Sequence, residues 1–337
     1  MIRRPPRSTQ GVSSAASDVY KRQVTDRCNF RCTYCMTENM SFLPKTEILT
    51  LEELEKVCAA FIDLGVKKIR ITGGEPLVRK NIMTLVKRLG SYKKNKQLEE
   101  LTMTTNGELL KKFSSQIYDS GIRRINVSLD TLNAKKFSAI TRGANLNKIL
   151  AGIAEAKACN LRIKINMVAL KGVNDDDFDE MIRWCGESGF DLTLIEVMPM
   201  GEMPDGRVNQ YLPLSIVRSE LEKKWTLQET NYKTPGPARY TTIKETGQRL
   251  GFITPMTHNF CESCNRIRVT CTGQLYMCLG RNNSMDLRRV IRKSDDPKVL
   301  TKAILSAMRK KPKGHDFVIN RRENDPAVLR HMNVTGG

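Results

Sequence analysis

From Thr50 onward, the chain alternates between helical and strand-like patterns of apolar positions. Thr50 and Glu53 form a predicted capping box at the start of a helix over 51–65, and Gly65 marks its end. Short apolar runs between the helical stretches are typical of buried strands. The predicted strands cover 67–72, 100–106, 123–130, 162–170 and 192–199, and the further predicted helices lie near 80–90, 110–119, 147–158 and 176–188.

Repeated strand–helix units of roughly 30 residues predict an α/β fold with parallel strands and helices on the outside. In β/α barrels, functional residues gather at the carboxyl ends of the strands. The segments TGGEP, TTNG, SLD and VMP all occupy such ends. The alternation of strand and helix patterns does not continue in residues 205–337, so we expect a smaller C-terminal region after a barrel over residues 24–204.

The first 23 residues differ from the rest of the chain. They have no apolar periodicity and are rich in Ser, Arg and Pro. A transit peptide would explain an Arg- and Ser-rich stretch with one acidic residue, but we favour a non-native leader. We therefore expect residues 1–23 to contribute no strand to the fold.

The composition limits the class of protein. With 337 residues, of which 40% are apolar, the chain can bury a sizeable core. No run of about 18 apolar residues is present, so we expect no membrane span. The formal charge of +20 favours phosphate-bearing partners. Because the basic residues show no basic–aromatic repeat, a nucleotide is a better candidate than a nucleic acid.

The ten cysteines indicate metal binding in a reducing, cytoplasmic setting rather than disulfides, because six of them fall into two compact groups. Cys58, Cys159 and Cys185 lie in helical stretches and are expected to be core residues. Cys271 is expected to belong to neither group.

The first group has the spacing C-x-x-x-C-x-x-C and consists of Cys28, Cys32 and Cys35. Three thiolates can hold three corners of a [4Fe–4S] cluster and leave the fourth iron open to a substrate. Zinc is the alternative, but a structural zinc site needs a fourth ligand, and no further Cys or His lies near these three in the sequence.

The second group consists of Cys261, Cys264 and Cys278, again three thiolates. His258 would be the fourth ligand if this were a closed zinc site. Arg266 and Arg268 follow directly and alternate along an extended segment, so both guanidinium groups can face one ligand. Arg suits the recognition of phosphate.

The motif C-x-x-x-C-x-x-C with Tyr34 before its last Cys, followed by a strand that ends in GGEP, resembles the radical S-adenosylmethionine (SAM) enzymes. The segment FCESCNRIRVTCTGQLYMCL and the terminal Gly336-Gly337 narrow the resemblance, over residues 24–337, to the GTP 3′,8-cyclases of molybdenum cofactor biosynthesis. The resemblance implies a partial (β/α)6 barrel with a C-terminal extension that carries a second [4Fe–4S] cluster. It also implies formation of 3′,8-cyclo-7,8-dihydro-GTP from GTP.

The resemblance further implies specific site residues. The SAM contacts would be Tyr34, Gly74, Ser128 and Met198, and the GTP contacts would be Arg70, Thr104, Lys164, Arg266, Ile267 and Arg268. The tail, Gly336 and Gly337, would enter the active site. Lys21 stands where the family has an Arg, inside the suspected leader, which puts one substrate contact in question.

The implied cofactors are two [4Fe–4S] clusters and SAM, and the implied partners are GTP, an electron donor and the next enzyme of the pathway. The resemblance does not decide whether the protein forms a homodimer. One alternative is another radical SAM enzyme with an auxiliary cluster, such as a peptide maturase. A more distant alternative is a zinc-stabilised nucleic-acid-binding protein, which the net charge alone would favour.

Overall fold

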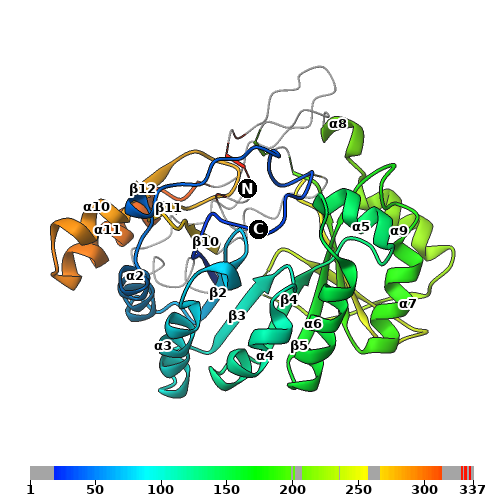
Figure 1. The fold of residues 1–337 in the computed structure, drawn as a ribbon, viewed down its shortest axis with the longest axis horizontal. Helices are drawn as coiled ribbons and strands as arrows, with labels where there is room; N and C mark the ends of the chain where they lie inside the picture. Colours follow the sequence, from blue (N-terminus) through cyan, green and yellow to red (C-terminus); the bar gives the residue numbers. More distant parts are fainter. Residues whose placement is uncertain are drawn as a thin grey trace, which may run out of the picture.

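The computed structural model describes residues 19–198, 200–201, 207–234, 236–256, 266–312, 328, 330–331 and 334. Their strands join in a single twelve-stranded sheet that curves around a central space, with helices on its outer side (Figure 1). Among these residues, no helix is both long enough and apolar enough to cross a membrane.

Six parallel strands that lie side by side in chain order form the centre of the sheet. These are β1 (Val19–Gln23), β2 (Lys68–Thr72), β3 (Glu100–Thr105), β4 (Arg124–Ser128), β5 (Arg162–Ala169) and β6 (Asp191–Glu196). The predicted strands from residue 67 to residue 199 are thus confirmed, with their ends shifted by a few residues.

Strands from the C-terminal part extend the sheet on both sides. On one side β10 (Arg266–Val269) runs parallel to β1 and is followed by β11 (Gln274–Tyr276) and β12 (Ser284–Asp286). On the other side β9 (Arg249–Ile253) runs parallel to β6 and is followed by β8 (Arg239–Ile243) and β7 (Leu227–Glu229). The C-terminal part therefore supplies both flanks of the barrel sheet.

The helices that follow the strands pack their apolar faces onto the outside of the sheet. The predicted helices correspond to α2 (Leu51–Asp63), α3 (Ile82–Lys94), α4 (Leu110–Asp119), α6 (Leu146–Ala158) and α7 (Phe178–Ser188). The capping box of Thr50 and Glu53 is confirmed, with both reciprocal hydrogen bonds present. The sequence patterns did not predict α5 (Ala134–Thr141). The remaining helices are α8 (Arg207–Gln210), α9 (Leu214–Glu222), α10 (Leu287–Lys293), α11 (Pro297–Arg309) and the short η2 (Lys45–Glu47) and η3 (Pro76–Val78).

The expectation that residues 1–23 contribute no strand is wrong for residues 19–23. These residues form β1, which pairs with β2 on one side and with β10 on the other. Tyr20 is fully buried, and its ring stacks on Phe61 of α2 at 4.4 Å. A strand position between two parallel neighbours satisfies the backbone hydrogen bonds of this segment on both sides, which local apolar periodicity cannot reveal.

Two of the three cysteines predicted to be core residues are buried, namely Cys58 and Cys185. The prediction is wrong for Cys159, which is only partly buried. Cys159 is the C-cap of α6, so its side chain leaves the face that packs on the sheet. Cys271 is 2% exposed and packs in the interior.

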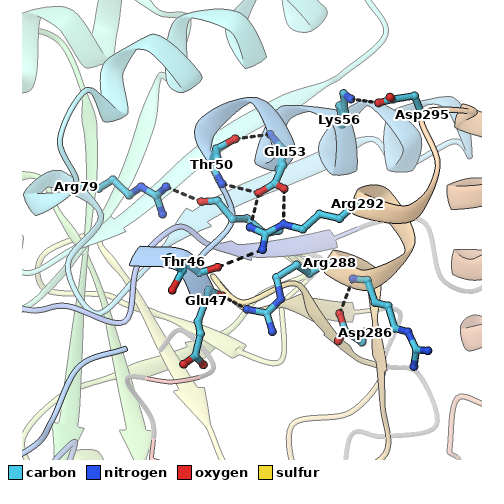
Figure 2. A network of polar contacts seen from close by, with 12 residues as sticks. Thr46, Glu47, Thr50, Glu53, Lys56, Arg79, Asp286, Arg288, Arg292 and Asp295 are labelled. Atoms are coloured by element: carbon cyan, nitrogen blue, oxygen red, sulfur yellow. Dashed lines mark hydrogen bonds and ion pairs between the residues drawn. The ribbon is translucent and has the colours of Figure 1, made fainter. Parts of the chain in front are cut away.

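A network of polar contacts attaches α10 to the start of α2 (Figure 2). The Arg292 guanidinium binds both carboxylate oxygens of Glu53, the residue that also completes the capping box. The Arg288 guanidinium donates to the carbonyl of Glu47, and Lys56 pairs with Asp295 at 2.8 Å. These contacts hold the C-terminal helices against the first helix of the barrel, and thereby hold β10 beside β1.

Candidate active site

One cavity brings together nearly all the site residues that the sequence predicted and the structure describes. Its lining includes Cys28, Cys32, Tyr34, Cys35, Arg70, Gly74, Thr104, Ser128, Lys164, Met198, Arg266, Arg268 and Cys278. Ile267 is the exception, because it is 1% exposed and packs in the hydrophobic core. Successive residues of a strand point to opposite faces, so the side chains of its two Arg neighbours face the cavity and that of Ile267 does not. Cys261, Cys264, Gly336 and Gly337 lie outside the described residues.

The loop that carries the first three cysteines is held in place by the end of α5. The backbone amides of Arg31 and Thr33 donate to the carbonyls of Thr141 and Ile140. The Arg142 guanidinium, just after that helix, donates to the Arg31 carbonyl at 2.8 Å and to the Met36 carbonyl at 3.0 Å. The helix that the sequence patterns missed therefore fixes the conformation of the cysteine loop.

Burial disfavours the thiolate form of the cysteines in this loop. Burial raises the pKa of Cys28 to about 11. The pKa of Cys32 is raised well above its usual range, first by burial and then by Cys35, Asp130 and Cys28 nearby. Buried thiols that raise one another's pKa remain protonated unless a metal offsets the negative charge.

Within the described part of the chain, no three Cys, His, Asp or Glu side chains are arranged to hold a single metal ion. An iron–sulfur cluster differs from a single ion because each thiolate binds its own iron. Cys28, Cys32 and Cys35 all line one cavity, where each thiolate could bind a different iron of one cluster.

The sulfur of Cys28 receives two weak hydrogen bonds. The Asn106 amide donates to this sulfur at 3.8 Å, and the Phe30 backbone amide donates to it at 3.4 Å. The carboxylate of Glu75 accepts from the Asn106 backbone amide at 2.7 Å, which fixes the loop after β3. Hydrogen bonds to the sulfurs are one means by which a protein sets the potential of an iron–sulfur cluster.

The glycine pair before Glu75 has a packing role as well as a place in the cavity wall. The Gly74 amide donates to the Thr25 carbonyl, and the Glu75 amide donates to the Arg27 carbonyl, both at 2.8 Å. A Cβ on Gly74 would clash with the Arg27 carbonyl. Glycine is therefore required at this position so that the segment after β2 can pack against the start of the cysteine loop.

Tyr34 is linked to the carboxyl ends of the barrel strands by its hydroxyl, which donates to Asp130 at 2.7 Å. The other carboxylate oxygen of Asp130 accepts from the Val168 amide at 2.8 Å, at the end of β5. Burial raises the pKa of Asp130 to about 6. This carboxyl group thus joins the cysteine loop to two barrel strands, and motif spacing alone did not indicate it.

Basic side chains also line this cavity. Lys21 is the register partner of both Arg70 on β2 and Arg268 on β10, so the three residues form one row across neighbouring strands. Lys164 of β5 is 8% exposed, and its Nζ donates to the Tyr240 hydroxyl at 3.2 Å. Lys164 therefore faces the inside of the barrel.

These cations lower one another's pKa. Burial lowers the pKa of Lys21 well below its usual value, and Arg268, Arg70 and Arg266 lower it further. Burial, then Arg70 and Arg124, lower the pKa of Lys164 to about 7. Buried cations that repel one another are costly unless an anion binds between them, so this part of the lining is suited to a polyanion.

Sequence reasoning missed several polar residues of the cavity. Asn126 precedes Ser128 by two positions on β4, and Asn166 follows Lys164 by two positions on β5. Alternate residues of a strand share one face, so each could have been inferred from its predicted neighbour. Thr72 could have been inferred from Arg70 on β2 in the same way.

Comparison with known proteins decides the family. The radical SAM superfamily pattern matches residues 23–185, and the pattern named Molybdenum Cofactor Synthesis C matches residues 190–317. This chain is 58% identical to the GTP 3′,8-cyclase of Agrobacterium fabrum over 314 residues, which are 93% of this chain and 90% of that protein. It is 59% identical to the GTP 3′,8-cyclase of Brucella canis, again over 314 residues, which are 93% of this chain and 91% of that protein. The chain belongs to the GTP 3′,8-cyclase family.

This GTP 3′,8-cyclase family member also resembles a solved structure, that of Streptococcus suis SuiB bound to S-adenosylmethionine. The TM-score is 0.60 at 16% identity, and the match covers 95% of this chain and 77% of SuiB. At that identity the similarity shows the fold alone. As a member of the radical SAM superfamily, the cyclase-family chain uses SAM and a [4Fe–4S] cluster.

Proposed function

We propose that this chain converts GTP into 3′,8-cyclo-7,8-dihydro-GTP, the first step of molybdenum cofactor biosynthesis. One observation carries the proposal: a single cavity is lined by the three cysteines of the loop, by Cys278 and by a row of cations on neighbouring strands. A SAM site and a nucleotide triphosphate site can therefore open into a space that both ligands share.

Cys28, Cys32 and Cys35 would hold the SAM-binding cluster, and Tyr34, Gly74, Ser128 and Met198 would contact SAM. When bound, the cluster would supply the electron for reductive cleavage of an S–C bond of SAM, which is the source of the 5′-deoxyadenosyl radical. The protein's part is to orient SAM, and the contacts of the Tyr34 hydroxyl and of the Asn106 amide support that role.

Cys261, Cys264 and Cys278 would hold a second [4Fe–4S] cluster beside the guanine base. The triphosphate would lie against Arg70, Thr104, Lys164, Arg266 and Arg268, with Lys21 between two of them. Ile267 would contribute only its backbone, because its side chain lies in the core. Charge-assisted hydrogen bonds from Arg to phosphate favour this arrangement.

In the proposed reaction, a hydrogen atom would pass from C3′ of the ribose to the 5′-deoxyadenosyl radical and give 5′-deoxyadenosine, and the resulting carbon radical would form a bond to C8 of guanine. One electron is consumed in SAM cleavage, and a second electron with a proton completes the product, so an external electron donor is required. The next enzyme of the pathway would then take the product. The protein contributes mainly the positioning of the two reactants and the exclusion of water.

The C-terminal tail is proposed to reach this cavity. Val328 pairs with Met200, and Arg330 donates to the Leu279 carbonyl at 2.8 Å. Met200 and Leu279 both line the cavity. These contacts bring the chain to the cavity wall shortly before Gly336 and Gly337, which supports a role for the tail in the site.

The test is anaerobic incubation of the reconstituted protein with SAM, GTP and a strong reductant, followed by analysis of the products. We expect equal amounts of 5′-deoxyadenosine and the cyclised nucleotide. Arg268→Ala and Arg266→Ala should each weaken GTP binding about ten- to a hundredfold, the equivalent of about 1.5–3 kcal/mol, and leave SAM binding nearly unchanged. Cleavage of SAM without any change in GTP would contradict the proposal.

A further inference from the structure

A second cavity, of about 510 Å³, lies at the opposite ends of the barrel strands. Its lining includes the first residue of each of five parallel strands, namely Lys68, Glu100, Arg124, Arg162 and Asp191. The volume is within the range of small-molecule sites. In β/α barrels the amino ends of the strands usually serve stability rather than function, so the fold does not account for a cavity of this size here.

The lining of this second cavity is strongly basic, with eight basic and three acidic side chains. Two of the acidic residues are already paired, because Glu100 binds Arg124 and Asp191 binds Arg249, each at 2.8 Å. Several cations are thus left without a carboxylate.

Among the cations of this lining, Lys68 and Arg162 are the most available to bind a ligand. Within the part of the chain that the structure describes, neither side chain has a hydrogen bond or an ion pair. Arg162 is exposed and Lys68 is partly buried, and they begin β5 and β2. Both can therefore turn toward a ligand without breaking an existing contact.

The like charges of this lining also affect proton binding. Burial, then Arg123, lower the pKa of Lys93 in this cavity; Glu100 opposes this shift, and Arg162 adds to it. Neighbouring cations are thus close enough to oppose one another's protonation. A multivalent anion would relieve that repulsion, and the planar guanidinium of Arg matches the oxygens of a phosphate group.

Three side chains separate the second cavity from the first. Lys164 and Thr234 line both cavities. The Tyr240 hydroxyl lies between them, 3.2 Å from the Lys164 Nζ and 3.4 Å from the Thr234 hydroxyl. The partition is thin and polar, so the two cavities are adjacent but have separate linings.

We propose that the second cavity is a binding site for a di- or triphosphate anion, held by Lys68 and Arg162 at the amino ends of the strands. The phosphate chain can belong to free inorganic pyrophosphate or to a nucleotide whose phosphates pass the Lys164 partition. The proposal does not depend on the cyclase reaction, because pyrophosphate contains neither base nor ribose.

The test is titration calorimetry of the reconstituted holoprotein with inorganic pyrophosphate, at constant ionic strength so that general screening is the same in every run. We expect saturable binding that weakens at least tenfold in the double variant Lys68→Ala/Arg162→Ala. Lys135→Ala, which removes an exposed cation of α5 outside this cavity, should bind pyrophosphate within twofold of the parent protein. The single variant Arg162→Gln provides the same comparison if the double variant does not fold.

A second titration, with GTP already bound, identifies the source of the phosphate. Undiminished pyrophosphate binding would mean that the site takes a free anion. If GTP displaces pyrophosphate and Arg162→Gln weakens both, the site takes the phosphates of the nucleotide. The proposal is overturned if pyrophosphate does not bind, if the double variant binds it as well as the parent, or if only Arg268→Ala abolishes binding.

Discussion

The hydroxyl of Tyr34 donates a 2.7 Å hydrogen bond to the buried carboxylate of Asp130. The two residues are 96 positions apart, and the bond joins the cysteine loop to the end of β4. Asp130 also accepts from the Val168 amide, so one carboxylate connects the loop to β4 and β5. The orientation of Tyr34, the residue between two cysteines, thus depends on a side chain that binds no metal.

Replacement of Asp130 by Ala should lower both stability and SAM affinity. The substitution leaves the Tyr34 hydroxyl and the Val168 amide without their acceptor, at a cost of about 1–3 kcal/mol for each group that stays buried and unpaired. Tyr34→Phe removes the same contact to Tyr34 but leaves no orphaned hydroxyl, so it should be milder. Thermal unfolding and SAM titration would measure both effects. Equal stability of Asp130→Ala and the parent protein would contradict the linking role.

Two cysteine groups predict two four-iron clusters. The anaerobically reconstituted protein should contain about eight irons per chain. Substitution of Cys28, Cys32 and Cys35 by Ala should halve this number and abolish 5′-deoxyadenosine formation. Cys261→Ala or Cys278→Ala should also halve the iron content, but uncoupled SAM cleavage should remain.

Cys271→Ala is the matched control, because Cys271 is a buried cysteine near the second group in sequence. Its iron content should equal that of the parent protein. Stoichiometric zinc with little iron in the parent would contradict the cluster assignment.

GTP affinity should depend on pH through Lys164. Burial and the neighbouring arginines lower the pKa of this residue to about 7 in the free protein, and a bound triphosphate should raise it again. Below pH 7 Lys164 is already protonated, and affinity is highest. As pH rises above 7, binding must take up a proton, so affinity should fall by up to about tenfold per pH unit until the pKa of the complex is reached.

Calorimetry in two buffers with different ionisation enthalpies would detect this proton uptake near pH 8. Lys164→Arg remains protonated throughout this range and should remove the part of the uptake that comes from Lys164, while any uptake by Lys21 remains. A pH-independent affinity in the parent protein would mean that the triphosphate does not contact Lys164.

Lys21→Arg should bind GTP more tightly and unfold at a lower temperature. Arg offers a planar pair of donors to phosphate and cannot shed its proton, whereas the pKa of Lys21 is lowered by burial and by Arg268 and Arg70. We expect GTP affinity to rise about three- to tenfold, the equivalent of roughly 1 kcal/mol. Lys21→Met should have the opposite effect on both measurements. If both variants change GTP affinity in the same direction, the change reflects packing rather than charge.

Arg22→Ile should stabilise the protein. Arg22 is fully buried, and two of its three guanidinium nitrogens have no hydrogen-bond partner among the described residues. An Ile fits a buried strand and removes these groups, which should gain about 1–3 kcal/mol of unfolding free energy. Arg22→Lys retains the buried charge and should not raise the melting temperature. Loss of stability in Arg22→Ile would imply that the Arg22 hydrogen bond to the buried Tyr20 hydroxyl, or a partner beyond the described residues, outweighs this gain.

Apolar periodicity by itself determined most of the barrel. The predicted strands and helices between residues 51 and 199 correspond to β2–β6 and to α2, α3, α4, α6 and α7. Periodicity is sufficient here because each element buries one face or both faces on its neighbours, and burial leaves a local pattern. Cysteine spacing and the GGEP segment determined the chemistry expected, because ligand type and spacing belong to the chain itself.

Only the tertiary structure decided which distant residues meet. β1 has no sequence pattern of its own, yet pairing with β2 and β10 makes it a central strand and sets Lys21 beside Arg70 and Arg268. The Tyr34–Asp130 hydrogen bond and the basic cavity at the amino ends of the strands likewise join residues from separate strand–helix units. Strand pairing depends on backbone hydrogen bonds to partners far away in sequence, and such bonds leave no local pattern in the sequence. Strand register and side-chain neighbours could therefore not be predicted from the sequence.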